Sequence, residues 1–214
     1  CGTLFPYTTL FRSATSGPGA TNLITGIADA MLDSTPLVCI TGQVPSALLG
    51  TDAFQETDVV GVSMPITKWN FQVTKAEEIP DAIARAFFIA KSGRPGPVLI
   101  DITKDAQFTE FDYSYEQYSQ IRSYTPFPKL DNSSVEQAAE LINKAKKPMI
   151  LVGQGVLLSG AQKEFKDFVE KTGIPVASTL LGLSAFPSNH PLFTGMLGMH
   201  RSEERRVGKE CATG

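Results

Sequence analysis

Two short segments of the chain could bring backbone groups to a ligand. Ser16–Asn22 reads SGPGATN, and its glycines would let N–H groups approach an anion at the start of a helix. The segment matches neither the GxGxxG nor the P-loop pattern, so a ligand-free turn is the alternative. Gly153–Val156 (GQGV) follows an apolar run. Open parallel sheets bind ligands beyond the carboxyl ends of such strands, although a plain strand-to-helix turn would look the same.

A third segment, TDAFQETD at 51–58, combines side chains that suit a small polar substrate. Gln55 offers both a donor and an acceptor, and Phe54 offers a flat apolar wall. Together they could orient a keto group beside an aromatic ring; a solvated loop is the alternative. Lys104, in DITKD, could anchor a substrate or could be a surface lysine with a partly covered stem.

Other site chemistries lack their residues. His190 and His200 have no second pair of ligands beside them, so we expect no zinc or other metal site. Ser16 does not lie in a GxSxG motif, and no Ser-His-Asp or Cys-His set is present. The cysteines, at positions 1, 39 and 211, form neither a CxxC pair nor a disulfide framework. This favours a reducing, cytoplasmic compartment, with Cys39 buried in an apolar run.

Composition sets the class of protein. The chain has 214 residues, 42% hydrophobic and 19% charged, which is typical of a globular protein. Its net charge of −3 disfavours nucleic-acid binding through a basic surface. No run of 18 apolar residues occurs, so no membrane-spanning helix is expected.

Both ends differ in character from the rest of the chain. Residues 1–13 (CGTLFPYTTLFRS) and 201–214 (RSEERRVGKECATG) resemble translated sequencing-adaptor DNA. We therefore exclude both from fold predictions, as one would exclude a tag. A genuine terminal extension is the alternative.

Apolar patterns predict how the candidate segments are positioned. Helices are expected over 20–33 and 76–93, and buried or half-buried strands over 36–42, 66–73 and 96–102. The tyrosine- and proline-containing stretch 107–132 has no periodicity and is interpreted as a linker that packs through its aromatic side chains. Helices over 133–147 and 161–173 and strands over 148–155 and 174–182 follow, with Ser133 or Ser134 capping the first helix and Gly173 ending the second. The side chains expected to face inward are Val135, Ala138, Leu141 and Ala145 in the first helix and Phe165, Phe168 and Val169 in the second.

Alternating strands and helices predict an α/β fold of parallel sheets with helices on both faces. Two partial domains fit the pattern, over 14–106 and 133–200.

The order of the motifs adds a resemblance. ATSGPGATNLITGIADAMLDSTPLVCITGQVP, GTDAFQETD, SGRPGPVLIDITKD, KKPMILVGQG, TGIPVASTLLGL and GMLGMH together resemble the acetolactate synthase (acetohydroxyacid synthase) large subunits, which are thiamine-diphosphate enzymes. The resemblance covers 14–200. It implies that 14–106 is the second half of a pyrimidine-binding domain and 133–200 the first half of a central FAD-associated domain.

The family condenses two molecules of pyruvate, or pyruvate and 2-ketobutyrate, with release of CO2, to acetolactate or acetohydroxybutyrate for branched-chain amino acid synthesis. The resemblance implies thiamine diphosphate, Mg²⁺ and a structural FAD as cofactors. It also implies a homodimer or tetramer with a small regulatory subunit. Glyoxylate carboligase, pyruvate oxidase or a non-catalytic flavin-binding module are the alternatives.

Residue roles carry over where motifs match. By resemblance Gln55 lies beside the reacting carbon, Phe54 lines the same pocket and Lys104 lies at the substrate entrance. The residues that would line FAD are Ser34, Arg94, Gly153, Gln154, Gly155, Thr179, Leu180, Leu197, Gly198, Met199 and His200. Gln154 departs from the glycine common there.

Two parts of the family's machinery are absent from this sequence. The resemblance places the catalytic glutamate before ATSGPGATN, and the GDG…NN segment that holds metal and diphosphate after His200. We therefore expect the 214-residue polypeptide by itself to be inactive. Because half-domains leave sheet edges and apolar faces uncovered, we also expect it to aggregate.

Overall fold

A computed structural model describes residues 9–114, 117–122, 124–126 and 129–198. The chain divides into two compact units. We call Tyr7–Lys129 the N-terminal unit, and the part from Leu130 onward the C-terminal unit. The boundary falls inside the stretch for which the sequence predicts a linker. None of the described helices is both long and apolar enough to cross a membrane.

The N-terminal unit is built on a parallel four-stranded sheet of order β1-β2-β4-β3. The strands are β1 (Leu10–Ala14), β2 (Leu37–Gln43), β3 (Trp69–Val73) and β4 (Pro97–Thr103). β2 and β4 are central, and every residue of β4 is buried. This explains why their sequences are continuous apolar runs rather than alternating ones.

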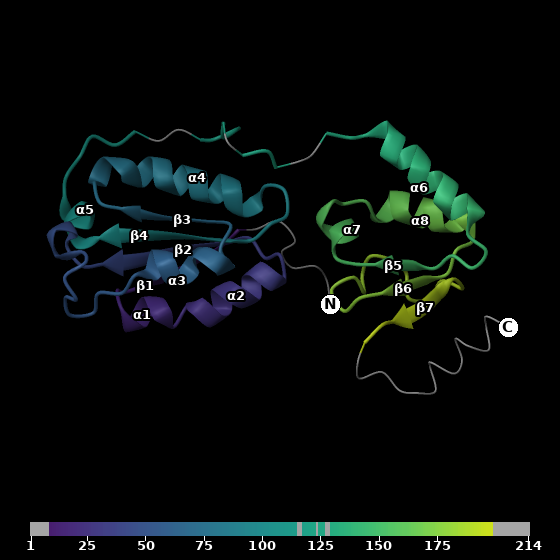
Figure 1. Cartoon of the computed structure of the whole chain (residues 1–214), viewed down its shortest axis with the longest axis horizontal. Helices are drawn as coiled ribbons and strands as arrows, with labels where there is room; N and C mark the ends of the chain where they lie inside the picture. The colour runs from purple at the N-terminus through teal and green to yellow at the C-terminus, as the bar shows by residue number, and fades with distance from the viewer. Residues whose placement is uncertain (1–8, 115–116, 123, 127–128, 199–214) are drawn as a thin grey trace. The chain divides into compact units, whose positions relative to one another are not determined.

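Helices cover both faces of this sheet, as the α/β pattern predicts (Figure 1). α4 (Ile79–Lys91) packs on one face through the cluster that contains Val98 and Ile100. The opposite cluster, which contains Cys39 and Leu99, packs against the other helices. These helices are α1 (Pro18–Thr21), α2 (Ile24–Leu32) and α3 (Val59–Ser63), and α5 (Lys104–Phe108) follows β4. Short 3-10 turns are η1 (Ser46–Leu48), η2 (Met64–Ile66) and η3 (Ala76–Glu78).

Three details differ from the sequence-based expectation for this unit. The helix expected over 20–33 is divided, because the Leu23 amide bonds to Ala20 O in a tighter turn. The strand expected from 66 starts at Trp69, because 64–66 form η2 with Pro65 at its start. Residues 10–13, excluded from the fold above, pair with β2 as most of β1; the origin of that segment stays a prediction.

The stretch after β4 is partly ordered against α4. Residues 107 and 108, the first two of the predicted linker, belong to α5 and are therefore helical. Further on, the Tyr124 ring meets Phe88 edge-to-face at 6.3 Å, and its hydroxyl bonds to Ser92 O at 3.1 Å. The stretch therefore packs on the surface through aromatic side chains, as the sequence indicates.

The C-terminal unit contains a three-stranded parallel sheet of order β5-β6-β7. Its strands are β5 (Ile150–Val152), β6 (Val176–Ser178) and β7 (Phe193–Met196), and its helices are α6 (Asn132–Lys144), α7 (Gly155–Leu158) and α8 (Gln162–Thr172). Phe165 and Val169 of α8 pack on Val152 and Val176. Gly173 ends α8 in the left-handed conformation, as predicted. The opposite face of β5 carries Leu151, which is 58% exposed.

The sequence pattern of α6 is misleading. Val135, Ala138, Leu141 and Ala145 are expected to face inward, yet all are exposed, Leu141 at 71%. The expected serine cap is also wrong. Asp131 caps the helix by accepting the Ser133 N–H at 3.1 Å, because its carboxylate directly precedes the first helical residue, Asn132, and reaches the free amides. Phe168 of α8, also expected inside, is 39% exposed.

Candidate functional site

The three candidate segments of the N-terminal unit lie after the carboxyl ends of neighbouring parallel strands. β1 ends just before Thr15, β2 leads into the loop that contains residues 51–58, and β4 ends at Thr103, just before Lys104. The carboxyl edge of a parallel α/β sheet is where such folds bind ligands. The strand order therefore brings SGPGATN, TDAFQETD and Lys104 to one edge.

Two of these segments are in direct contact at Gly17 and Gln55. Gly17 is buried with φ +57°, and a Cβ placed on it would lie 2.7 Å from Gln55 O. Only glycine permits so close an approach. The close approach of the Gln55 backbone thus explains why the first glycine of SGPG, Gly17, is needed there. α1 has only four residues, so its N-terminus supplies no phosphate site by itself.

The loop that carries Phe54 and Gln55 is closed by Glu56. The Glu56 carboxylate accepts hydrogen bonds from the backbone N–H groups of Gly50 and, at 3.0 Å, of Ala53. These bonds stabilise the charged form and lower the pKa of Glu56 below its usual range. Gln55 has φ +61°, an uncommon backbone conformation for this residue type. The result is a loop whose Phe54 side chain is 89% exposed and whose Gln55 is also exposed.

A buried polar cluster, which the sequence did not reveal, lies beneath this loop. The Asp101 carboxylate, 0% exposed, accepts hydrogen bonds from Thr41 Oγ1 at 2.7 Å, Gln43 Nε2 at 3.0 Å and Gln72 Nε2 at 3.1 Å. Burial raises the pKa of Asp101, although these donors oppose the rise. Gln43 also donates to Thr57 O at 2.8 Å, which joins the cluster to the loop.

Lys104 starts α5 with an exposed side chain. Its neighbour Asp105 fixes the start of this helix to η1, because it accepts hydrogen bonds from Ser46 Oγ and, at 2.9 Å, from Ser46 N. Hydrogen bonding from Ser46 lowers the pKa of Asp105 to about 2. The segments after β2 and β4 are therefore tied together at the same edge as the loop.

The carboxyl edge of the second sheet gathers most of the residues expected to line FAD. Gly153–Gly155 follow β5, Thr179 and Leu180 follow β6, and Leu197 and Gly198 follow β7. Main-chain hydrogen bonds join the ends of adjacent strands here. The Thr179 N–H donates to Val152 O at 2.9 Å, and the Leu197 N–H donates to Ser178 O at 2.8 Å.

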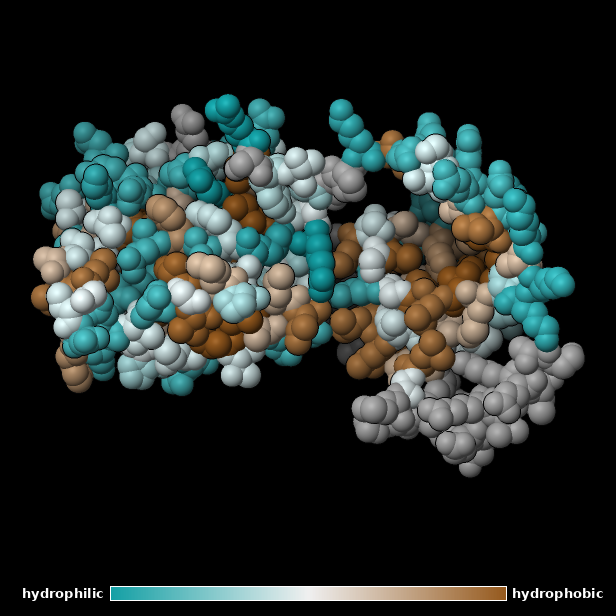
Figure 2. All heavy atoms as spheres, viewed as in Figure 1, coloured by the Kyte–Doolittle hydropathy of each residue, from teal (hydrophilic) through white to brown (hydrophobic). Residues whose placement is uncertain are grey.

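This edge leaves main chain open beside apolar side chains. A Cβ on Gly155 would meet nothing within 4 Å, and one on Gly153 only Thr179 Oγ1 at 3.8 Å. Leu180 is 67% exposed, and apolar side chains gather where β5, β6 and β7 lie (Figure 2). Open backbone beside exposed leucine suits an aromatic cofactor.

Ser34 and Arg94, the FAD candidates in the N-terminal unit, bind each other. Arg94 Nε donates to Ser34 Oγ at 2.8 Å, and Arg94 Nη2 donates to Met31 O and Leu32 O. Arg94 thus satisfies carbonyls at the end of α2. Met199 and His200 lie outside the described residues.

The remaining reactive side chains have ordinary surroundings. Cys39 is buried, as expected, and burial raises its pKa to about 11. His190 Nδ1 accepts the Leu192 N–H at 3.2 Å. Within the described part of the chain, no three His, Cys, Asp or Glu side chains gather as metal ligands.

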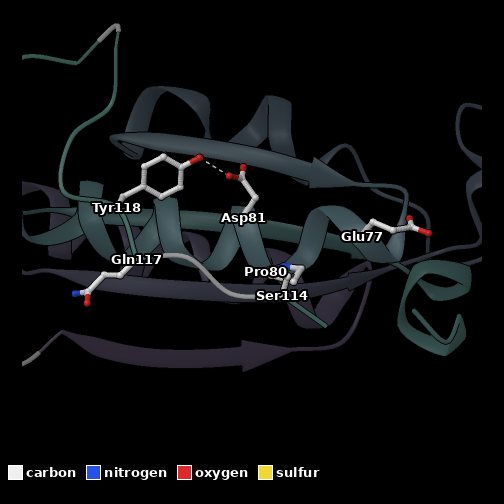
Figure 3. Close-up of a pocket in the computed structure, with 6 residues that line it drawn as sticks. All are labelled: Glu77, Pro80, Asp81, Ser114, Gln117 and Tyr118. Atoms are coloured by element: carbon white, nitrogen blue, oxygen red, sulfur yellow. Dashed lines mark hydrogen bonds between the residues drawn. The ribbon is translucent and has the colours of Figure 1, made fainter. Parts of the chain in front are cut away.

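A cavity of about 260 Å³ lies against the first turns of α4 (Figure 3). Its lining residues are Glu77, Pro80, Asp81, Ser114, Gln117 and Tyr118. Asp81 pairs with Arg85 at 3.1 Å and accepts a hydrogen bond from the Tyr118 hydroxyl. The Asp81 carboxylate is therefore already paired within the chain.

Two family models match the sequence. Residues 12–62 match the N-terminal TPP binding domain of thiamine pyrophosphate enzymes, and residues 135–210 match their central domain. The sequence is 54% identical over 187 residues to the acetolactate synthase large subunit of Corynebacterium glutamicum, covering 87% of this chain and 30% of that protein. It is 53% identical over 189 residues to chloroplastic acetolactate synthase 2 of Nicotiana tabacum, covering 87% and 28%.

A solved structure is also similar. It is an X-ray structure assigned to a thiamin diphosphate-dependent enzyme isolated from Mycobacterium smegmatis, with a TM-score of 0.73 and 29% identity. The match covers 88% of this chain and 36% of that one. The chain thus spans about a third of the length of these relatives.

Proposed function

Because the chain belongs to the thiamine pyrophosphate enzymes, we propose that it forms part of an acetolactate synthase large subunit. The reaction would join two pyruvates, or pyruvate and 2-ketobutyrate, with loss of CO2, in branched-chain amino acid synthesis. The observation that carries the proposal is the 54% identity over 187 residues with such a subunit.

The loop at the first sheet edge supports a substrate-orienting role. Gln55 would place its amide against the keto or carboxylate oxygen of a 2-ketoacid, since one amide can donate and accept. Phe54, exposed beside it, would supply the apolar wall, and the Lys104 ammonium would attract the substrate carboxylate. Thiamine diphosphate, when bound, supplies the electron sink for decarboxylation.

The second sheet edge supports a structural FAD. The backbone of Gly153 and Gly155 would approach the cofactor, and Leu180 and Leu197 would contact its apolar surface. Gln154 is half-buried between the two glycines. Met199 and His200 would contribute as the resemblance implies. We place Mg²⁺ with the complete protein, on ligands outside residues 14–200.

The complete protein would work as a homodimer or tetramer with a small regulatory subunit in the cytoplasm. The buried free thiol of Cys39 suits a reducing compartment. These features rest on the resemblance to the acetolactate synthases.

A chimera tests the function. In the chimeric subunit, the matched segment of the Corynebacterium glutamicum relative is replaced by the 187 matched residues of this chain. We expect the chimera to form acetolactate from pyruvate, and acetohydroxybutyrate when 2-ketobutyrate is added. A folded, cofactor-loaded chimera that acts on glyoxylate instead, or oxidises pyruvate, would overturn the proposal.

A further inference from the structure

We propose that Asp101 is a positioning residue: through the side-chain amide of Gln43 it fixes Thr57, and with it the loop that presents Phe54 and Gln55. The consequence for turnover rests on the proposed function. The mechanical link between Asp101 and the loop does not, because it is a chain of hydrogen bonds within the N-terminal unit.

The Asp101 carboxylate is an acceptor surrounded by donors from adjacent strands. Thr41 and Gln72 lie directly opposite Asp101 in β2 and β3, and Gln43 lies two residues beyond Thr41. All three hydrogen bonds to the carboxylate come from neutral side chains. Burying a carboxylate with neutral partners costs stability compared with an apolar residue, so a role in orienting its partners is the better explanation.

The orientation of the Gln43 amide follows from Asp101. Gln43 Nε2 donates to both Asp101 Oδ2 and Thr57 O, and Gln43 Oε1 accepts the Val44 N–H at 2.9 Å. The opposite orientation would place Oε1 against two acceptors, the carboxylate and the Thr57 carbonyl. The ionised Asp101 carboxylate can only accept, so it fixes this orientation of the Gln43 amide.

Thr57 is the end of the loop nearest the sheet. It lies two residues after Gln55, and Asp58, the next residue, caps α3 by accepting the Gly61 N–H at 2.8 Å. Within the loop, the Glu56 carboxylate accepts hydrogen bonds from the backbone N–H groups of Gly50 and Ala53. Gln55, with its uncommon positive φ, is therefore held between an internal tie and the anchor from Gln43.

Four substitutions in the chimeric subunit separate positioning from general stability. Asp101→Leu removes the acceptor, and Gln43→Met removes the link. Asp101→Asn keeps an acceptor toward Gln43, because its Nδ2 can donate to Thr41 Oγ1, a hydroxyl that can also accept. Thr41→Val is the matched control, since it removes a hydrogen bond to the same carboxylate without touching the loop.

Hydrogen–deuterium exchange of the peptide 50–58 is the first measurement. Asp101→Leu and Gln43→Met should each speed its exchange by about tenfold, because each removes a hydrogen bond that involves a charged group or the loop backbone. The double variant should show no further increase, since both changes break one path. Asp101→Asn and Thr41→Val should stay within about twofold of the unmodified chimera.

The kinetic split is the second measurement. A displaced Gln55 should lower kcat for acetolactate formation by about 10- to 100-fold in Asp101→Leu and Gln43→Met, with rescue in Asp101→Asn. Unchanged loop exchange in Gln43→Met, or equal loss in Thr41→Val, would overturn the proposal. If Asp101→Leu does not fold, Gln43→Met decides. Faster loop exchange in a chimera without carboligase activity would instead reject the proposed function and leave the positioning role standing.

Discussion

Gly17 and Gln55 fix each other's backbone at the residue scale. The buried Gly17 has φ +57° and lies against the backbone of Gln55, which has φ +61°. Residues other than glycine rarely adopt such positive φ values. The positive φ of Gln55 is an uncommon backbone conformation, of the kind that functional loops often contain. Nearby, Asp105 and Glu56 tie the surrounding loops through backbone N–H groups.

Gly17→Ala tests this contact. In the chimeric subunit it should cost about 3 kcal/mol of stability and lower kcat, because the new Cβ would overlap Gln55 O. Gly50→Ala is the control: its φ is +77°, yet a Cβ there meets nothing within 4 Å. It should cost only about 1 kcal/mol. Chemical unfolding and steady-state kinetics measure both effects, and equal losses would contradict the contact.

The link between Asp105 and Ser46 should depend on acid. The Asp105 pKa is lowered from 3.8 to about 2, so the ionised carboxylate stabilises the fold above pH 4 and this contribution is lost as pH falls from about 4 to about 2. Exchange protection of the Ser46 amide should fall across that window. In Asp105→Asn the same window should be flat; an equal fall in that variant would refute the assignment.

The sequence could identify Phe54, Gln55 and Lys104 as candidates because their side-chain chemistry is visible in the motif. It could not identify the groups that hold them. Asp101 is the one charged residue of a strand that is otherwise mostly apolar, and its hydrogen-bond donors come from two other strands, distant in the sequence. Glu56 acts through backbone N–H groups, which no side-chain pattern encodes.

At the element scale, burial explains which predictions succeed. β2, β4 and α4 are predicted well because both central strands are sandwiched between helices and α4 buries one continuous stripe. α6 has the same amphipathic pattern, but within the described residues nothing buries its apolar side chains. Short edge elements such as β7 lack the length for a clear periodic signal.

Leu180 tests the second sheet edge as an FAD site. Leu180→Asp in the chimeric subunit should lower the flavin retained per protomer at least about tenfold, because a charge would face an apolar ring. Its high exposure means that folding should be little affected. Leu130→Asp, also exposed and in the same unit, is the control. Flavin absorbance after gel filtration gives the readout; unchanged flavin in Leu180→Asp would place the cofactor elsewhere.

At the scale of the whole molecule, apolar surface and unpaired strand edges are prominent. β1 and β3 are the edges of the first sheet, and Phe11 and Phe71 on them are exposed. Exposed leucines, Leu180, Leu181 and Leu197, also follow strands of the second sheet. Figure 2 shows hydrophobic residues gathered in this region. Such surfaces promote association when nothing covers them.

The 214-residue polypeptide by itself should therefore self-associate. By the resemblance to the acetolactate synthases, it should also form no acetolactate. Sedimentation velocity at several concentrations should show species that grow with concentration, and a colorimetric acetolactate assay should match a no-protein control. A monodisperse monomer with a cooperative thermal transition would contradict the association. Acetolactate above the control would contradict the expected inactivity.

In the proposed function, the loop at the first sheet edge presents Gln55 to a 2-ketoacid. The most direct measurement of this role is acetolactate formation by the chimeric subunit carrying Gln55→Ala, beside Gln162→Ala as an exposed glutamine on α8. Loss of an orienting amide should lower kcat by about 100-fold in Gln55→Ala, with flavin content unchanged and Gln162→Ala fully active. Full activity in Gln55→Ala would show that Gln55 does not orient the substrate.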